Sequence, residues 1–88
     1  MAYDVKFRPE AEEDLKKLEK PLAQRILSKI KWLSDNCVLI DHKPLTGDLA
    51  GYLKLRVGDY RIIYLINSLN QFIDVCMIGH RKDIYKID

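Results

Sequence analysis

Residues 53–64 read LKLRVGDYRIIY, two short runs of mixed apolar and charged residues joined by a glycine and an aspartate. In the first run apolar residues alternate with cations, and successive side chains of a β-strand point to opposite faces of a sheet. Gly58-Asp59 places glycine first, which suits a two-residue hairpin turn. The segment therefore predicts a β-hairpin with one apolar and one cationic face.

The turn also predicts the register of this hairpin. Arg56 is expected opposite Arg61, and opposed residues share a face. Lys54 lies two residues before Arg56, so it belongs to the same face and is expected opposite Ile63. The other face is apolar and is predicted to receive helices; its members are Leu53, Leu55, Val57, Tyr60, Ile62 and Tyr64.

Residues 3–36 predict a strand followed by a helical hairpin. Residues 3–7 alternate with the period of a half-buried strand. Pro9 stops that strand and suits the first position of a helix, whose early acidic residues and late lysines follow the order that a helix dipole favours. Pro21 separates this helix from a second one, whose apolar stripe is Leu22, Ile26, Ile30 and Leu33.

The remaining segments predict a long loop and one more strand. Residues 37–51 are expected to be mostly loop, with residues 38–40 packing underneath it or forming a brief strand. A last strand is expected over residues 72–78, after a four-residue loop at 67–70. On this register the residues that face the core are Ile73, Val75 and Met77. The residues beside Arg61 are Asp74 and Cys76.

These elements predict an α+β fold. An N-terminal strand, a helical hairpin and a three-stranded antiparallel meander would give a single, mainly antiparallel sheet packed on two helices. The 88 residues suffice for one small hydrophobic core, so a single domain over residues 1–88 is expected.

Composition and charge exclude several functional classes. No apolar run approaches the roughly 20 residues that span a bilayer, and no signal peptide is recognisable, so a cytoplasmic protein without a membrane partner is expected. Cys37 and Cys76 are far apart, and only two scattered histidines could join them, which favours reduced thiols and neither a metal site nor a cofactor. The net charge is only +2, but acidic residues crowd the N-terminal part of the chain, so a polyanion site is expected in the C-terminal half.

Each cation of the hairpin has a functional and a structural interpretation. Arg61 lies within an apolar run, where it either binds a polyanion or forms a salt bridge to Asp59 or Asp74. Lys54 and Arg56 either bind a polyanion or form a solvated strand face. The residue pattern leaves both interpretations open.

A second group of candidates follows the last strand. Arg81 could hold a phosphate through two hydrogen bonds or pair with Asp83. His80 could act as an acid or a base, or simply be exposed beside Arg81 and Lys82. Loops at the ends of strands often carry function, which favours this segment as part of a site.

Three aromatic residues are also ambiguous. Tyr85 could stack on an unpaired base or anchor the C-terminal tail to the core, and Tyr52 has the same two options. Trp32 lies off the main apolar stripe of the second helix, at the edge of the core or in a groove for a partner.

The segment LKLRVGDYRIIY, together with KPLTGDLAG at residues 43–51, resembles the RelE/ParE superfamily of toxins from bacterial and archaeal type II toxin–antitoxin pairs. The resemblance covers nearly the whole chain, and the ending GHRKDIY at residues 79–85 is similar to the RelE-like branch. It implies a ribosome-dependent endoribonuclease that cuts messenger RNA and so inhibits translation. The implied chemistry is metal-free attack of a ribose 2′-hydroxyl on the adjacent phosphate.

The resemblance also assigns catalytic roles. Lys54 corresponds to a lysine proposed as base or phosphate ligand, and Arg61 to the arginine that stabilises the transition state. Arg81 corresponds to an arginine proposed to stabilise or protonate the leaving oxygen. Tyr85 resembles the tyrosine that stacks on the substrate base, and His80 is a candidate substitute or assistant for the base.

Further residues extend the expected site or depart from the family pattern. Arg56, Lys82 and Tyr52 are expected to bind RNA. The second strand lysine of some members is replaced here by Tyr52 or Leu53, and the chain is expected to lack the terminal helix that some members carry.

The resemblance implies partners and leaves rival functions. The expected partners are an acidic, RelB-like antitoxin that masks the cations, the ribosome and messenger RNA, with no sequence-specific DNA contact unless the antitoxin is bound. One rival is a ParE-like inhibitor of DNA gyrase without nuclease activity, and another is a catalytically inactive RNA-binding homologue. Retention of Lys54, Arg61, Arg81 and Tyr85 favours the nuclease.

Overall fold

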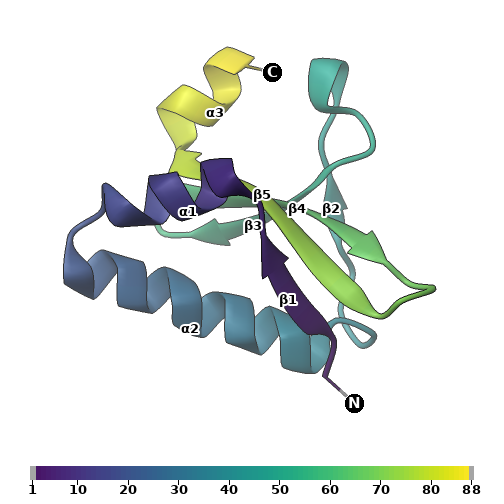
Figure 1. Cartoon of the computed structure of the whole chain (residues 1–88). Helices are drawn as coiled ribbons and strands as arrows, with labels where there is room; N and C mark the ends of the chain where they lie inside the picture. The colour runs from purple at the N-terminus through teal and green to yellow at the C-terminus, as the bar shows by residue number, and fades with distance from the viewer. Residues whose placement is uncertain (1, 88) are drawn as a thin grey trace.

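A five-stranded sheet runs through the molecule, with helices on both of its sides (Figure 1). The strand order is β1-β5-β4-β3-β2, with β1 parallel to β5 and every other neighbouring pair antiparallel. This computed structural model describes residues 2–87, and the side chains of residues 2–84. The strands are β1 (Asp4–Phe7), β2 (Lys43–Pro44), β3 (Leu53–Val57), β4 (Tyr60–Asn67) and β5 (Phe72–His80).

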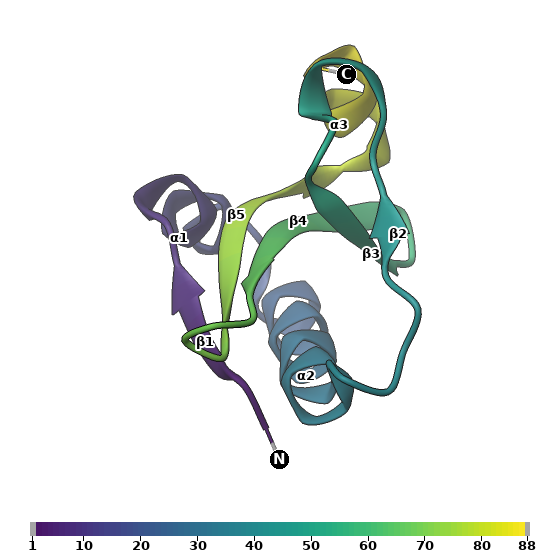
Figure 2. The ribbon, with the colours of Figure 1, turned by 90° about the vertical axis from the view of Figure 1, so that its right-hand side faces the viewer.

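The helices cover the two faces of the sheet unequally. The long helix α2 (Lys20–Asn36) lies against one face, and α1 (Pro9–Lys16) lies beside β5. Figure 2 shows α3 (Arg81–Ile87) and the 3₁₀ turn η1 (Gly47–Leu49) on the side of the sheet opposite α2. The α+β architecture is therefore as predicted, and none of the described helices has the length and apolar character needed to cross a bilayer.

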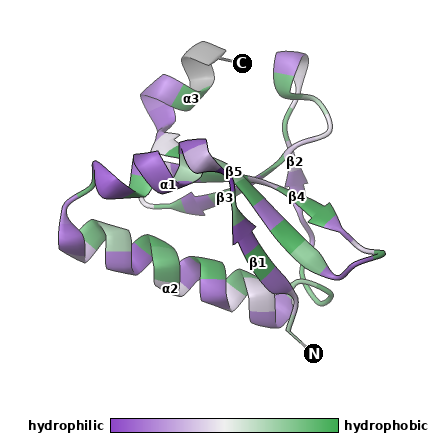
Figure 3. Cartoon of the chain, viewed as in Figure 1, coloured by the Kyte–Doolittle hydropathy of each residue, from purple (hydrophilic) through white to green (hydrophobic). Residues whose placement is uncertain are grey.

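The larger core lies between the sheet and the helical hairpin. Figure 3 shows hydrophobic and hydrophilic residues alternating along α2, as an amphipathic helix requires. Ile26 and Leu33 of α2 are fully buried, and they share one cluster with Ile62, Tyr64 and Val75 of the sheet. The predicted apolar face of the hairpin is thus confirmed as the face that receives the helices.

A smaller cluster covers the other face of the sheet. Leu45, just before η1, and Leu49, its last residue, pack with Ile63 of β4 and Ile84 of α3. Gly79 makes room for α3, because a Cβ at this position would lie 3.3 Å from Ile84 Cδ1. Helix α3 corrects the expectation that no terminal helix is present: the helix begins directly after β5 and is held by the close approach of Ile84 to the strand.

The register of the β3–β4 hairpin is as predicted, whereas that of β4–β5 is not. Ile63 pairs with Met77 but Tyr64 pairs with Val75, so Cys76 is an extra residue in a β-bulge. The bulge moves Met77 to the face of Ile63, so its predicted position on the core side was wrong. The loop is also one residue later than predicted, at residues 68–71.

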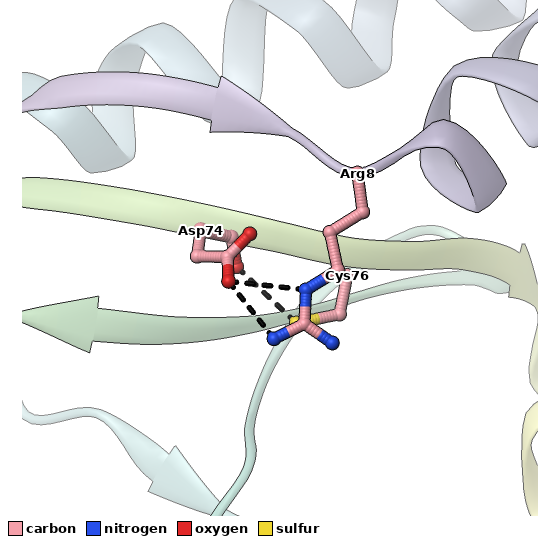
Figure 4. A network of polar contacts seen from close by, with 3 residues as sticks. All are labelled: Arg8, Asp74 and Cys76. Atoms are coloured by element: carbon pink, nitrogen blue, oxygen red, sulfur yellow. Dashed lines mark hydrogen bonds and ion pairs between the residues drawn. The ribbon is translucent and has the colours of Figure 1, made fainter.

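Asp74 has a different partner from the one expected. It lies opposite Leu65 rather than near Arg61, and its carboxylate accepts hydrogen bonds from Arg8 Nε at 3.1 Å and Nη2 at 2.9 Å (Figure 4). Cys76 Sγ donates to the backbone oxygen of Asp74 in the same group. The bond to Asp74 is the main reason why the pKa of Arg8 is raised, and this ion pair ties the start of α1 to β5.

The segment after α2 also differs from the prediction. Leu39 N–H and Ile40 N–H both donate to the carbonyl of Asn36, which continues the helix end as a turn and points Val38 and Leu39 outward. Their exposed fractions are 71% and 81%, so neither packs under the loop, and only Ile40 contacts the core. The brief strand is β2, later in the loop, where Lys43 and Pro44 pair with β3.

The outer edge of β5 is protected by α1 beyond the end of β1. Arg8 N–H donates to Val75 O at 2.9 Å, and Asp14 Oδ2 accepts from Ile78 N–H at 2.9 Å. An unpaired strand edge would otherwise expose these groups to other chains. Asp14 therefore caps this edge of β5.

Replacing this cap should destabilise the fold. Asp14→Ala leaves the Ile78 N–H without its acceptor, and we expect the free energy of unfolding to fall by about 1–3 kcal/mol in urea denaturation. Glu13→Ala is the matched control, because Glu13 forms only a surface pair with Lys16 and its removal should cost less than about 1 kcal/mol. Equal stability of the two variants would contradict the capping role.

Candidate active site

The side chains of two arginines and the backbone of a third contact the turn between β3 and β4. Arg61 Nη1 donates to Gly58 O at 3.2 Å and to Tyr60 O at 3.1 Å, and Arg56 Nε lies 3.4 Å from the same Gly58 oxygen. The backbone N–H of Arg81 donates to Asp59 O at 2.8 Å. The turn therefore brings Arg81, which is distant in sequence, to the predicted pair Arg56 and Arg61.

Arg61 is much more buried than a surface cation. Only 5% of it is exposed, although it lies directly opposite the exposed Arg56 in the hairpin. A buried charge is tolerated when hydrogen bonds satisfy it, and the carbonyls of the turn do so here. These bonds fix the guanidinium at the turn, so its geometry is set before any ligand arrives.

Lys54 lies one row further along the same face. It pairs with Ile63 of β4, as the sequence predicted, and with Lys43 of β2 on its other side. Lys54 is half-buried, whereas Lys43 is exposed. The short strand β2 thus places a second lysine beside Lys54, from a segment that is distant in sequence.

A cavity of about 380 Å³ opens along this part of the sheet. Trp32 of α2 and Leu55 of β3 contribute apolar surface, and Asp41 is the one acidic residue among those that line it. A neighbouring hollow of about 590 Å³ shares Trp32, and no acidic residue lines it. The two hollows are bordered by Arg25, Lys29, Lys43, Lys54, Arg56 and Arg61.

His80 precedes Arg81 in the chain but does not share a face of the sheet with Arg61. It pairs with Tyr60 while Gly79 pairs with Arg61, so His80 and Arg61 are on opposite faces of the sheet. Its ring packs edge-on against Tyr60, with 5.4 Å between ring centroids, and Nδ1 accepts from the backbone N–H of Lys82 at 3.2 Å. These contacts give His80 a structural role, in which its ring nitrogen accepts a hydrogen bond from the first turn of α3.

The other candidates are placed around α3 and η1. Lys82 is exposed in the first turn of α3, near Arg81 in sequence. Tyr52 is partly buried against the cluster formed by Leu45 and its neighbours, which favours its structural interpretation. The backbone of Tyr85 belongs to α3, but its side chain lies outside the described residues.

Sequence reasoning missed the cations contributed by α2 and β2. Arg25, Lys29 and Trp32 follow a spacing of four and three residues, which places them on one face of a helix and was a usable signal. Lys29 Nζ lies 4.1 Å from the centroid of the Trp32 ring. Lys43 had no such signal, because its pairing with Lys54 depends on a two-residue strand inside a loop.

A buried polar group holds the loop that leads to Lys43. Tyr64 Oη and His42 Nδ1 are 2.5 Å apart, and His42 Nε2 lies 2.7 Å from Cys37 O. Because the carbonyl can only accept, Nε2 carries a proton and donates, so Nδ1 of the neutral ring accepts from the Tyr64 hydroxyl. Burial raises the pKa of the Tyr64 hydroxyl and of the Cys37 thiol, which keeps both groups protonated.

The described residues offer no evident place for a metal ion. No group of three or more histidine, cysteine, aspartate or glutamate side chains comes together among them. Cys37 and Cys76 are both buried and free, and they belong to separate parts of the fold.

Comparison with known proteins gives consistent matches. Residues 5–85 match the family model described as ParE toxin of type II toxin-antitoxin system, parDE. Toxin RelG of Mycobacterium tuberculosis is 31% identical over 86 residues, covering 98% of this chain and 99% of that protein.

Two solved structures have the same fold. A toxin–antitoxin complex, RelBE2 of M. tuberculosis, has a TM-score of 0.82 at 29% identity and covers 92% of this chain and 93% of the matched one. The archaeal RelE–RelB complex of Pyrococcus horikoshii has a TM-score of 0.72 at 29% identity, with 92% and 97% covered. The first is described as a toxin–antitoxin complex and the second as a complex of RelE with RelB.

Removing the Tyr64 hydroxyl should loosen the support of β2. Tyr64→Phe leaves His42 Nδ1 without its donor, and we expect the free energy of unfolding to fall by about 1–3 kcal/mol. Tyr60→Phe is the control, because Tyr60 is only partly buried and no hydrogen bond from its hydroxyl is present among the described residues. The hydroxyl of Tyr64 would have no supporting role if both variants unfolded at the wild-type urea concentration.

Proposed function

This chain belongs to the RelE/ParE family of toxins from type II toxin–antitoxin systems, and we propose that it is a RelE-like endoribonuclease that cleaves messenger RNA on the ribosome and so inhibits translation. The observation that carries the proposal is the cluster of Arg56, Arg61 and Arg81 around one turn, with Lys54 in the next row of the sheet. Such a cluster suits a reaction whose transition state gathers negative charge.

The proposed reaction is a transesterification within the RNA chain. The ribose 2′-oxygen forms a bond to the adjacent phosphorus, and the bond from phosphorus to the 5′-oxygen breaks. A base accepts the proton of the 2′-hydroxyl, and an acid donates a proton to the leaving 5′-oxygen. The products are a cyclic phosphate and a 5′-hydroxyl end, so the reaction needs no metal, oxidant or further reactant.

Arg61 is the group that suits charge stabilisation best. Its guanidinium is already oriented by the carbonyls of Gly58 and Tyr60, and a preorganised donor loses little on reaching the transition state. Arg56 is exposed directly opposite and would draw the phosphate to the same place. Arg61 therefore stabilises the pentavalent phosphorus and Arg56 helps to bind it.

Proton transfer falls to Lys54 and Arg81 in this proposal. Lys54 lies on the face of Arg61 and lines the cavity, so its amino group is positioned to contact the 2′-hydroxyl or the phosphate. Arg81 is exposed at the start of α3, where it would stabilise or protonate the leaving oxygen. His80 is less well placed as a base, because its ring packs on the other face of the sheet.

We also propose that an acidic, RelB-like antitoxin controls the toxin. Solved relatives of similar fold are RelB–RelE complexes. The cations that border the two hollows outnumber the acidic residues there, so an acidic chain would neutralise the site when it covers them.

Inhibition of DNA gyrase is the rival function that one finding favours. The matching family model is described by the ParE toxin rather than by RelE. The two functions differ in their cellular targets. Induction of the chain in growing cells followed by primer extension on messenger RNA, with plasmid supercoiling measured in parallel, separates them: cuts within translated codons support the nuclease, and relaxed or broken DNA with intact messages supports the gyrase inhibitor.

Replacement of the proposed catalytic cations should abolish cleavage without unfolding the chain. We expect Arg81→Ala to slow the cutting of ribosome-bound messenger RNA about 100-fold or more, because an exposed charge is lost at the leaving oxygen. Arg61 is buried, so Arg61→Lys tests its two-pronged geometry while keeping its charge, with a comparable loss expected.

Lys17→Ala is the matched control, an exposed lysine at the end of α1 that should leave the rate unchanged. Thermal unfolding followed by circular dichroism checks that each variant folds. Wild-type cleavage rates in both arginine variants would refute the nuclease site.

A further inference from the structure

Two pairs of cations lie in successive rows on one face of the sheet. Arg56 and Arg61 face each other across β3 and β4, and Lys54 and Lys43 face each other across β3 and β2. Lys54 and Arg56 are two residues apart on β3, so both rows point to the same side. We propose that Lys43, beside Lys54, forms a second phosphate-binding subsite, which holds the phosphate of the RNA chain next to the one that is cleaved.

The spacing of the rows suits successive phosphates. Two residues along a strand span about 6.7 Å, which is comparable with the step between neighbouring phosphates of an extended RNA chain. Side chains of directly opposed residues have Cβ atoms about 4.5–5.5 Å apart, so an RNA chain that contacts Lys54 also comes within reach of the Lys43 amino group. Lys43, Lys54, Arg56 and Arg61 all line the same cavity.

The lysine pair is unfavourable for folding, which indicates another purpose. Like charges directly opposite each other in a sheet destabilise it. In the described part of the chain, neither Lys43 nor Lys54 has an ion pair with a carboxylate that would relieve the repulsion. Residues that oppose the local stability of a fold tend to belong to functional sites.

Contacts on both sides of Lys43 hold it in this position. β2 has only two residues and pairs with β3 solely through Lys43 and Pro44. The residue before Lys43 is His42, which is held by Tyr64 on one side and Cys37 on the other. On the far side of β2, Leu45 N–H donates to Tyr52 O at 2.9 Å. Lys43 is thus positioned from both ends although its own side chain is exposed.

The strand of Lys54 itself does not extend this row of cations toward its N-terminal side. Tyr52, two residues before Lys54, packs against the apolar cluster around η1. Lys43 offers a positive charge next to Lys54 from a different strand. The inference rests on the proposed function, since it presumes that RNA is the polyanion.

The subsite can be tested without catalysis, with a 2′-O-methyl oligouridylate that lacks the attacking hydroxyl. We expect Lys43→Ala to weaken binding of this RNA severalfold and to reduce the slope of log affinity against log salt by about 0.7, the value for one phosphate contact on a single strand. Lys43→Arg should restore both. Urea denaturation should show Lys43→Ala to be at least as stable as wild type, because the repulsion with Lys54 is removed.

Lys31→Ala is the matched control, an exposed lysine of α2 that does not line the cavity, and its RNA affinity should stay at the wild-type value. Wild-type affinity and salt slope in Lys43→Ala, or failure of Lys43→Arg to restore them, would overturn the subsite even if ribosome-dependent cleavage is found. Absence of RNA binding and of cleavage by the wild-type chain would overturn the subsite and the nuclease together.

Discussion

The two-residue turn at Gly58-Asp59 is the constraint on which the rest of the site depends. Gly58 has a φ of 58° while Asp59 has no positive φ, the combination found in a type II′ turn, whose twist matches that of the strands it joins. A side chain at Gly58 would be strained by this φ. The turn sets the register of β3 against β4, and register decides which residues of two alternating strands share a face.

The same turn also connects segments that are distant in sequence. Its carbonyls accept from Arg56 and Arg61 within the hairpin and from the backbone of Arg81 at the start of α3. The carbonyl oxygens of the hairpin tip therefore accept hydrogen bonds that position these three residues around the turn. The burial of Arg61 follows from this arrangement, since the turn supplies acceptors that a core normally lacks.

Local sequence predicts those parts of the fold that local chemistry determines. The alternation in residues 53–64 and the prolines at 9 and 21 gave the hairpin register and the helical boundaries, because each depends on residues close in the chain. The β-bulge at Cys76 was not predictable in this way, since the extra residue is defined only against a partner strand. The pairing of Lys43 with Lys54 and the ion pair between Arg8 and Asp74 were not predictable either, because each joins residues that are distant in sequence. Among the candidate site residues, Lys54, Arg56 and Arg61 were brought together by register alone, whereas Arg81 needed the fold.

Trp32 gives the molecule a spectroscopic property that follows from its position. It is the only tryptophan in the chain, 40% exposed, and it lines both hollows beside the cationic rows. The amino group of Lys29 lies over its ring, so the local field on the indole changes whenever Lys29 is drawn toward an anion. The tryptophan fluorescence of this protein therefore originates beside its cationic site, and the occupancy of that site can be followed in the native chain without any label.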